Sequence, residues 1–321
     1  MSAARAIGLL LGVAADAALG DPRRGHPVAA FGRAATAAEK VLYRDHKAPG
    51  VAYTALLGGA AVLLGAVAER VTRRSPVAQA ATTAVATWAV LGGASLAREG
   101  TLMGRALDAG RIDEARARLP HLCGREPGTL DGPGLARATV ESVAENTSDA
   151  VVAPLFWGAV AGVPGLLGYR AVNTLDAMVG HRSARYRNFG WASARLDDLA
   201  NLAPARAAAA LTALCAPVVG GSAGGAWRTW RRDASAHPSP NAGQVEAAFA
   251  GALEVRLGGR TVYGRGPDRR VEERPVLGDG RTPDAGHVTR AVELSRVVGA
   301  VAGAASAATA LVLGARRSRR R

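Results

Sequence analysis

Residues 139–154 read Thr-Val-Glu-Ser-Val-Ala-Glu-Asn-Thr-Ser-Asp-Ala-Val-Val-Ala-Pro and lead directly into an apolar segment. The acids Glu141, Glu145 and Asp149 are spaced four residues apart, which on an α-helix stacks them along one face. Like charges at this spacing repel by about 0.2–0.5 kcal/mol per pair, so a metal ion, an arginine or a cationic substrate is expected to face them. The alternative is a solvated acidic helix face. Carboxylates at the mouth of a membrane span are costly, which favours a functional site.

Apolar segments recur along the rest of the chain, and a complete membrane span needs roughly 20 mainly apolar residues. Candidate segments are residues 6–20, 51–68, 77–97, 150–169, 203–223 and 297–314. We therefore predict an all-α fold, a multi-pass helical membrane protein with five or six apolar segments joined by helical polar loops. The polar segments are residues 98–149, 173–202 and 225–296, and residues 1–321 are expected to form a single membrane-embedded domain. The alternative is a soluble protein with alanine-rich core helices.

Composition narrows the class of protein. The chain of 321 residues has a formal net charge of +14, which suits nucleic acid, an anionic membrane surface or anionic substrates. Its basic residues cluster at span ends, aromatic residues are only 4%, and no nucleic-acid-binding motif occurs, so a nucleic-acid partner is not expected. The two cysteines are in no metal-ligand spacing. The basic C-terminus is expected in the cytoplasm by the positive-inside rule.

A second polar stretch follows the apolar segment that ends near residue 169. Arg170, Asn173 and Thr174 share one helix face, with Asp176 beside it. A dense cationic loop comes next, and it suits phosphate groups through charge and forked hydrogen bonds. Its members are His181, Arg182, Arg185 and Arg187. The alternative is a juxtamembrane loop that binds lipid headgroups.

Paired acids follow this loop. Asp197 and Asp198 have Asn201 one helical turn later. Magnesium is usually bound through one or two carboxylates plus phosphate oxygens, so this group is a candidate metal site. The alternative is a helix surface or an interhelical ion pair.

The remaining connections give local predictions only. Residues 98–122 are expected to form a helical pair, residues 243–257 an amphipathic helix, and the Gly-, Pro- and Arg-rich residues 258–286 a loop with a strand at most over Thr261–Tyr263. Asn241 suits a turn and an N-cap. No Walker loop, dinucleotide fingerprint or serine nucleophile elbow occurs in the sequence.

Several of these strings, taken in order, resemble one known family. They are Asp16…Gly20-Asp21-Pro22…His26-Pro27-Val28, Glu141-Ser142-Val143-Ala144-Glu145-Asn146-Thr147-Ser148-Asp149, Tyr169 to Gly180, Asn188-Phe189-Gly190 leading to Asp197-Asp198, Ser239-Pro240-Asn241-Ala242-Gly243, and Tyr263-Gly264. The chain resembles the CobD/CbiB family of adenosylcobinamide-phosphate synthases in cobalamin biosynthesis, from residue 12 to about residue 280. A second glycine expected after Tyr263-Gly264 is missing.

The resemblance implies a membrane enzyme that joins a propionate carboxylate of (adenosyl)cobyric acid to the amine of aminopropanol or its O-phosphate. The product would be (adenosyl)cobinamide or its phosphate. This ligation is expected to consume ATP with magnesium, and no tightly bound cofactor is evident. The implied partners are the corrinoid, the aminoalcohol and the lipid membrane. A partner protein or a homo-oligomer stays open.

On that chemistry the polar residues receive candidate roles. Magnesium or the substrate ammonium is expected at Glu141, Glu145 and Asp149, and a metal or base at Asp176, Asp197 and Asp198. Phosphate or the corrin carboxylate is expected at Arg170, His181, Arg182 and Arg187. Corrin side-chain amides are expected at Asn146, Asn173 and Asn241. The competing interpretation is a membrane transporter or a sensor of an anionic ligand.

Overall fold

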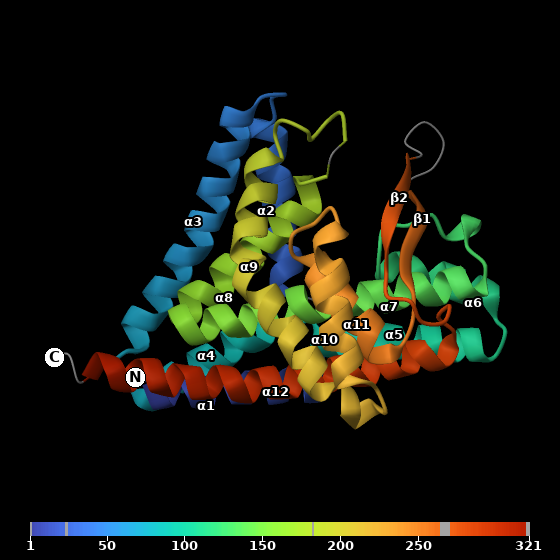
Figure 1. The fold of residues 1–321 in the computed structure, drawn as a ribbon. Helices are drawn as coiled ribbons and strands as arrows, with labels where there is room; N and C mark the ends of the chain where they lie inside the picture. Colours follow the sequence, from blue (N-terminus) through green and yellow to red (C-terminus); the bar gives the residue numbers. More distant parts are fainter. Residues whose placement is uncertain (1, 23–24, 182, 264–269, 319–321) are drawn as a thin grey trace. The chain divides into compact units, whose positions relative to one another are not determined.

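The computed structural model describes residues 2–22, 25–181, 183–263 and 270–318 (Figure 1). Its long helices are α1 (Ser2–Leu19), α2 (Pro27–Leu42), α3 (Lys47–Thr72), α4 (Pro76–Val90), α5 (Gly93–Asp108), α6 (Ile112–Arg118), α7 (Gly132–Thr147), α8 (Ala153–Val179), α9 (Trp191–Cys215), α10 (Ala223–Asp233), α11 (Ala242–Leu253) and α12 (Ala285–Ser318). Single-turn helices are η1 (Leu119–His121), η2 (Pro127–Thr129), η3 (Ser148–Val152), η4 (Ala216–Val219) and η5 (Ala234–Ala236). The strands are β1 (Leu257–Tyr263) and β2 (Arg270–Leu277).

The protein is a helical, multi-pass membrane protein. Among the described residues, six helical runs are long and apolar enough to cross a membrane. They are Ser2–Leu19, Lys47–Thr72, Pro76–Asp108, Gly132–Val179, Trp191–Val219 and Ala285–Arg316. Each of the six apolar segments expected from the sequence falls in one of these runs, so the predicted fold class is confirmed.

Contacts divide the chain into two compact units. The first unit comprises Met1–Gly92, Asp149–Asn201 and Ala302–Arg321, and the second comprises Gly93–Ser148 and Leu202–Val301. The boundaries fall at η3 and inside α9 and α12. Neither unit is a continuous stretch of chain. The single membrane-embedded domain stays a prediction.

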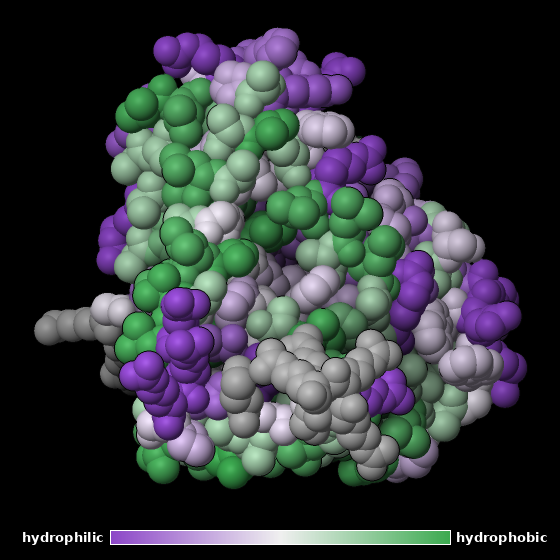
Figure 2. Space-filling view, turned by 90° about the vertical axis from the view of Figure 1, so that its left-hand side faces the viewer, coloured by the Kyte–Doolittle hydropathy of each residue, from purple (hydrophilic) through white to green (hydrophobic). Residues whose placement is uncertain are grey.

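Close helix packing builds the first unit. A Cβ on Gly8 of α1 would lie 2.5 Å from Thr83 Cβ of α4, and a Cβ on Gly12 would collide with Thr87 in the same way. Glycines four residues apart let two helix backbones approach, as they do in many membrane helix pairs. The outer face of α3 is apolar, and Figure 2 shows hydrophobic side chains gathered along it. Its exposed members include Val51, Leu56, Val62, Leu63, Leu64 and Val67.

Helix α8 is broken in its middle. Gly162 has φ 69° and ψ −147°, and Pro164 follows. The amide N–H of Val163 is satisfied by Oε1 of Glu69 on α3 at 3.1 Å, and Arg5 of α1 donates to the same oxygen at 3.1 Å. The break therefore has its own polar partners, which a break inside a membrane requires.

The second unit contains a feature that the sequence analysis missed. Strands β1 and β2 pair as an antiparallel hairpin, with Thr261 opposite Glu272 and a register shift between Leu257 and Gly259. The expectation of a loop over residues 258–286 was wrong, because these residues contain most of β1 and all of β2. Of the hairpin, only Thr261–Tyr263 was expected as a possible strand. Gly258 and Gly259 have φ of 84° and 79°, a conformation that favours glycine and produces the shift.

Two helix boundaries also differ from expectation. The apolar run at residues 77–97 is interrupted at Leu91 and Gly92, because the Gly92 N–H donates to the Ala150 carbonyl at 3.2 Å instead of continuing α4. The helix expected at residues 243–257 ends at Leu253. It is buried almost all round rather than amphipathic, because α7, α10 and the hairpin pack against it. The helical pair expected over residues 98–122 is present as α5 and α6.

Candidate functional site

The second unit buries an acidic side chain on α7. The side chain of Glu141 is 3% exposed and forms an ion pair with Arg125, which is 5% exposed. The other carboxylate oxygen, Oε1, accepts the N–H of Gly258 at 2.7 Å. The positive φ of Gly258 places that N–H toward the carboxylate, so the hairpin bulge serves the site. Removing one member of such a pair would leave an uncompensated buried charge.

Helix α7 is held in place at both ends of this stretch. Asp131 caps its first turn by accepting the N–H of Gly134 at 2.8 Å. Ser142 Oγ donates to the carbonyl of Leu122 at 2.7 Å, which ties the helix to the segment that carries Arg125. Asn146 Nδ2 donates to the carbonyl of Ser142 at 2.9 Å. The side-chain amide oxygen of Asn146 accepts no hydrogen bond from the described residues.

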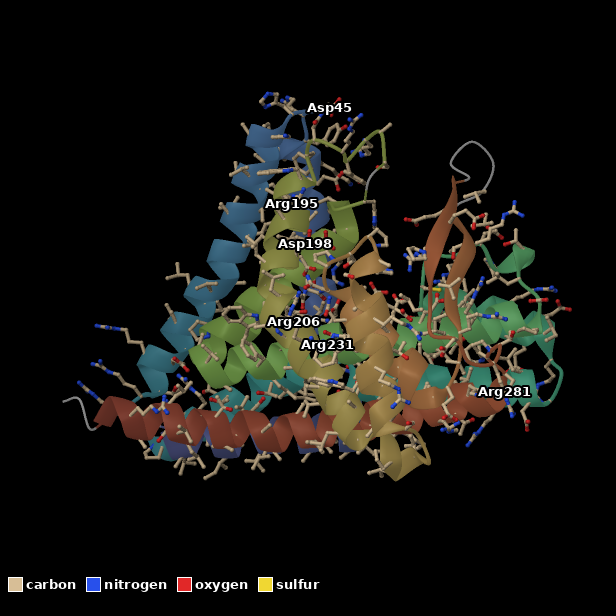
Figure 3. All side chains as sticks on the ribbon, viewed as in Figure 1. Asp45, Arg195, Asp198, Arg206, Arg231 and Arg281 are labelled. Atoms are coloured by element: carbon tan, nitrogen blue, oxygen red, sulfur yellow. The ribbon has the colours of Figure 1, made fainter. Side chains whose placement is uncertain are left out.

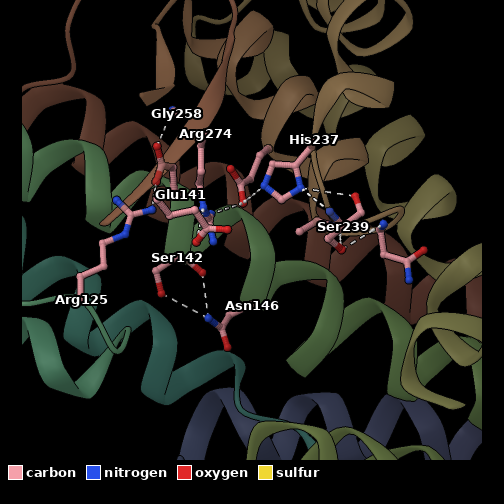
Figure 4. A network of polar contacts seen from close by, with 12 residues as sticks. Arg125, Glu141, Ser142, Asn146, His237, Ser239, Gly258 and Arg274 are labelled. Carbon is pink, nitrogen blue, oxygen red and sulfur yellow. Dashed lines mark hydrogen bonds and ion pairs between the residues drawn. The ribbon is translucent and has the colours of Figure 1, made fainter. Parts of the chain in front are cut away.

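Glu246 of α11 completes a cluster of three carboxylates with Glu141 and Glu145. Figure 4 shows Glu141 of this cluster beside Arg125, with Arg274 and His237 nearby. Its side chain is 1% exposed, and neither carboxylate oxygen has a hydrogen-bond partner among the described residues. Burial raises the pKa of Glu246 well above its usual value. The charges of Glu141 and Glu145 raise this pKa further, and Arg274 and Arg125 lower it. An unsatisfied carboxyl group at this depth is costly unless a ligand or a function compensates it.

Two basic groups approach Glu246. Arg274 Nη1 of β2 and His237 Nε2 each lie 3.8 Å from its Oε1. Burial lowers the pKa of His237, and the positive charge of Arg274 lowers it further. His237 is therefore favoured as the neutral imidazole. The three carboxylates thus face two guanidinium groups, of Arg125 and Arg274, which leaves one negative charge in excess when all are ionised.

The Ser239–Asn241 turn positions His237. Its Nδ1 accepts the N–H of Ser239 at 3.1 Å, and Ser239 Oγ accepts the N–H of Ala242 at 3.1 Å. The expectation that Asn241 caps the following helix was wrong, because its side chain makes no capping hydrogen bond and is buried instead. Ser239 satisfies the first helical N–H groups in its place.

Glu145 differs from its two neighbours in the cluster. It lies one helical turn after Glu141 on α7 and keeps exposed surface, whereas Glu141 and Glu246 are buried. Arg125 and Arg274 act on it as attractive charges. Glu145 is therefore the member of the cluster that a solute can reach.

A second polar network lies in the first unit. Tyr169 OH donates to Asn201 Oδ1 at 2.8 Å and to the Asp149 carbonyl at 3.2 Å. Asn201 Nδ2 donates to Asp197 Oδ2 at 3.0 Å, and Asn173 Nδ2 donates to Asp197 Oδ1 at 3.3 Å. Arg170 Nη1 donates to Asn173 Oδ1 at 3.4 Å. Arg170 and Asn173, which were expected on one polar helix face, are thus linked to Asp197 through the side-chain amide of Asn173.

The first motif of the chain belongs to the same unit. Asp21 acts as an attractive charge on Arg170, and Nε2 of His26 lies 3.6 Å from Asp21 Oδ1. His26 Nδ1 caps α2 by accepting the Val28 N–H at 3.1 Å.

The three acids predicted to form one row, Glu141, Glu145 and Asp149, do not lie on one continuous α-helix. The α-helical register ends at Thr147, and Asp149 lies in the π-helical turn η3 in the first unit.

The other predicted residues lie at the surface or outside the described chain. His181 and Arg187 are exposed, Arg185 pairs with Glu39 at 3.0 Å, and Arg182 lies outside the described residues, as does Gly264. Asp176 is partly exposed on α8, one turn before its end. Asp198 lies 3.7 Å from Arg195 on the outside of α9, and Figure 3 shows both on that helix. The alternative for Asp197 and Asp198 was a helix surface or an interhelical ion pair, and the pair of Asp198 lies within α9.

No group of three or more His, Cys, Asp or Glu side chains in the described parts of the chain is placed to hold a metal ion. Glu145, Asp149, Asp197 and Asp198 therefore do not form one joint metal site there. A single carboxylate or a pair remains sufficient for a magnesium ion that arrives with phosphate oxygens. Their metal role stays a prediction.

Sequence reasoning missed several residues of these clusters. Arg125 received no role in the sequence analysis, and Arg274 lies in the unrecognised strand. Glu246 lies in the helix expected over residues 243–257 and received no role of its own. One signal was available for Glu246, since it is a single acid among Val245, Ala247, Ala248 and Phe249 on a short helix.

Comparison with known proteins identifies the family to which the chain belongs. The family model described as "CobD/Cbib protein" matches residues 9–295. The chain belongs to the CobD/CbiB family.

Curated members of this family are similar over nearly the whole chain. The "Cobalamin biosynthesis protein CobD" of Mycobacterium tuberculosis is 58% identical over 309 residues, which covers 96% of each chain. The protein of that name from Chromobacterium violaceum is 42% identical over 94% of this chain and 95% of its own. The one from Geobacter metallireducens is 44% identical over 86% of this chain and 87% of its own. No solved structure matches. The family resemblance read from the sequence is confirmed.

Proposed function

We propose that this protein acts in cobalamin biosynthesis as an ATP-dependent ligase, which joins a propionate carboxylate of (adenosyl)cobyric acid to the amine of aminopropanol or its O-phosphate. Family membership and the names of its relatives support the pathway. The amide ligation itself follows from the family resemblance and from the chemistry of the carboxylate cluster.

The observation that carries the proposal is the unsatisfied, buried carboxyl group of Glu246 beside Glu141 and Glu145. With one carboxylate more than guanidinium groups, the cluster favours a bound cation. The ammonium group of an aminoalcohol is such a cation, and its three N–H donors match oxygens that lack partners. Glu145 is exposed and is therefore the carboxylate that a substrate would meet first.

The reaction can be written with this chain's residues in stated roles. An oxygen of the corrinoid carboxylate attacks the γ-phosphorus of ATP, which forms an acyl phosphate and releases ADP. The amine nitrogen attacks the acyl carbon, the C–O bond to phosphate breaks, and inorganic phosphate leaves with one carboxylate oxygen. The amine must lose a proton, and Glu246 in its ionised form is the base, because a raised pKa makes that carboxylate a stronger proton acceptor than a solvated one.

The arginines complete the site. Arg125 forms an ion pair with Glu141, so its guanidinium group serves the structure of the site and not a substrate. Arg274 lies 3.8 Å from both Glu246 and Glu272, and its guanidinium group would stabilise negative charge that develops at the acyl phosphate. Asn146 and Asn241 are candidates to hydrogen-bond the amide side chains of the corrin.

Magnesium fits as a companion of the nucleotide and not as a resident metal. The described residues offer no group of three ligands, whereas the exposed Glu145 supplies the single carboxylate that is sufficient for such a site. When bound, the ion would neutralise phosphate charge.

The test uses detergent-solubilised protein with cobyric acid, aminopropanol phosphate, ATP and magnesium. Mass spectrometry would detect a corrin product heavier by the aminoalcohol minus water, together with ADP. With ¹⁸O in the cobyric acid carboxylate, the proposal expects ¹⁸O in the released phosphate. Folded protein that binds cobyric acid but forms no amide would favour a transporter or a sensor.

A further inference from the structure

The second unit contains a cavity of about 760 Å³ beside α10, α11 and the turn after β2. Its lining includes Trp227, Arg228 and Arg231 of α10, Gly251 of α11 and Gly280. Small-molecule pockets have volumes of roughly 300–1,000 Å³, so a ligand of nucleotide size fits. None of these residues belongs to the carboxylate cluster.

Two arginines of the cavity have no hydrogen-bond or ion-pair partner among the residues that the structure describes. Arg228 and Arg231 are exposed, and their guanidinium groups make no hydrogen bond or ion pair with any residue in the described parts of the chain. Arg232 is committed, with Nε 2.6 Å from Asp233 Oδ1 and Nη1 3.0 Å from Asp279 Oδ2. Arg232 is thus shared between Asp233 and Asp279, which is one of the two acids of the lining.

The other acid, Glu254, is exposed at the end of α11. The lining therefore carries three arginines and two acids, and Arg228 and Arg231 are the guanidinium groups placed to bind an anion. Guanidinium groups bind phosphate oxygens through forked hydrogen bonds.

An aromatic side chain is held beside the arginines. Trp227 is 50% exposed, and its ring lies 5.1 Å from that of Trp230 in an edge-to-face arrangement. Trp230 is fixed in turn, because its Nε1 donates to Gln244 Oε1 at 2.8 Å. An exposed, fixed indole offers a surface on which a nucleobase can stack.

We propose that this cavity binds the nucleoside triphosphate, with the polyphosphate on Arg228 and Arg231 and the base against Trp227. This proposal rests on the ATP-dependent ligation proposed above and assigns its nucleotide site. Helix α11 links the two sites, since Ala250 of the cavity follows Glu246 by one helical turn, about 6 Å along the helix axis. The terminal phosphate can therefore be directed toward the cluster.

The test measures binding of ATP and of inorganic tripolyphosphate to the full-length protein in detergent. In the variant with Arg228→Ala and Arg231→Ala, both ligands should bind about tenfold or more weakly, since each substitution removes a charge-assisted phosphate contact. Trp227→Ala should weaken ATP binding by about tenfold and leave tripolyphosphate binding unchanged, because only ATP carries a base. Arg206→Ala is the matched control, as this exposed arginine of α9 donates to the Leu202 carbonyl outside the cavity.

Several outcomes would overturn the proposal. Unchanged ATP affinity in the double arginine variant would place the nucleotide elsewhere, and the ligation assay would then still stand. If the same two arginines instead governed retention of phosphatidylglycerol with no effect on ATP, the cavity would be a lipid headgroup site. Wild-type protein that forms the amide without binding ATP would overturn the cavity and the ATP requirement together. ATP binding lost in the variants, but without amide formation by the wild type, would support the cavity and contradict the ligation.

Discussion

His237 Nε2 lies 3.8 Å from Glu246 Oε1, and both side chains are almost fully buried. Their surroundings favour neutral forms of both, because burial raises the pKa of Glu246 and lowers the pKa of His237. We therefore expect the charge state of this pair to control stability and, in the proposed ligation, activity.

Glu246→Gln should stabilise the protein at neutral pH and abolish ligation. A raised pKa means that the stabilising contribution of Glu246 is fully present below its ordinary value of 4.5 and is lost as the pH rises toward the folded value. The glutamine of the variant does not ionise, so the variant does not lose stability in this way as the pH rises. Its unfolding free energy should therefore exceed that of the wild type by about 1 kcal/mol or more at pH 8. Thermal unfolding in detergent at pH 4.5 and pH 8 measures this. An equal effect at both pH values would contradict the assigned pKa direction.

His237→Gln should change the pH dependence in the opposite direction. Because the pKa of His237 is lowered from 6.5, the neutral histidine stabilises the fold above pH 6.5, and this contribution is lost as the pH falls through the folded value. The wild type should therefore lose stability on acidification below pH 6.5 more steeply than the variant. Parallel stability curves for the two proteins would show that His237 does not titrate in this way.

Arg125→Met should destabilise the second unit strongly. It leaves the carboxylate of Glu141 buried without its ion-pair partner, which costs about 3–5 kcal/mol in comparable cases. The control Asp113→Asn removes an exposed pair with Arg116, where about 0–1 kcal/mol is expected. Unfolding of both variants in the same detergent gives the comparison. Similar losses for the two would mean that the Arg125–Glu141 pair is not buried as described.

The sequence indicated more about the fold than about the site. Length and apolarity of the segments predicted all six membrane runs, since these are local properties. The β1–β2 hairpin was missed because its glycines and arginines hide the strand pattern. The acidic spacing of Glu141 and Glu145 correctly indicated a positive group nearby. Nothing in the sequence identified that group as Arg125, because only the folded chain brings the two together.

The same limit applies to the first unit. Asn201 was placed beside Asp197 from its spacing on one helix, which the hydrogen bond at 3.0 Å bears out. The link of Asn201 to Tyr169 crosses two helices and was not predictable from spacing. Gly8 and Gly12 carry the four-residue spacing of close helix pairs, and their role became clear only with Thr83 and Thr87 opposite them.

Gly12→Val should disrupt the first unit. The added side chain collides with Thr87 of α4, so α1 and α4 must separate and lose their backbone contact. We expect a lowered yield of folded protein in detergent. Leu10→Val is the matched control, because Leu10 is 45% exposed on the same helix. Normal thermal stability of Gly12→Val would contradict the close approach of the two helices.

Tyr169→Phe should cost about 1–3 kcal/mol of stability, because it leaves the buried Oδ1 of Asn201 without its donor. Tyr43→Phe is the control, since that hydroxyl donates to an exposed carbonyl of Arg185 where water can replace it. Unfolding midpoints in detergent provide the measurement. Equal, small losses for both variants would show that the Tyr169 hydroxyl is hydrated.

A reporter fused after Arg321 should be active only in the cytoplasm. The expectation rests on the basic residues that follow the last apolar run, at Arg316, Arg317, Arg319, Arg320 and Arg321. A pair of fusions, one active in the cytoplasm and one active outside it, distinguishes the two orientations. Activity of the external reporter would reverse the predicted orientation.

The most direct test of the ligase account compares the wild type with Glu246→Gln in the complete reaction. Cobyric acid, aminopropanol phosphate, ATP and magnesium are supplied, and the corrin products are identified by mass. The account predicts an ATP-dependent amide product from the wild type and a loss of at least about a hundredfold in rate for the folded variant. Amide formation by Glu246→Gln at the wild-type rate would contradict the role of the buried carboxylate cluster. If folded wild-type protein bound its substrates but formed no amide, the ligation itself would be contradicted.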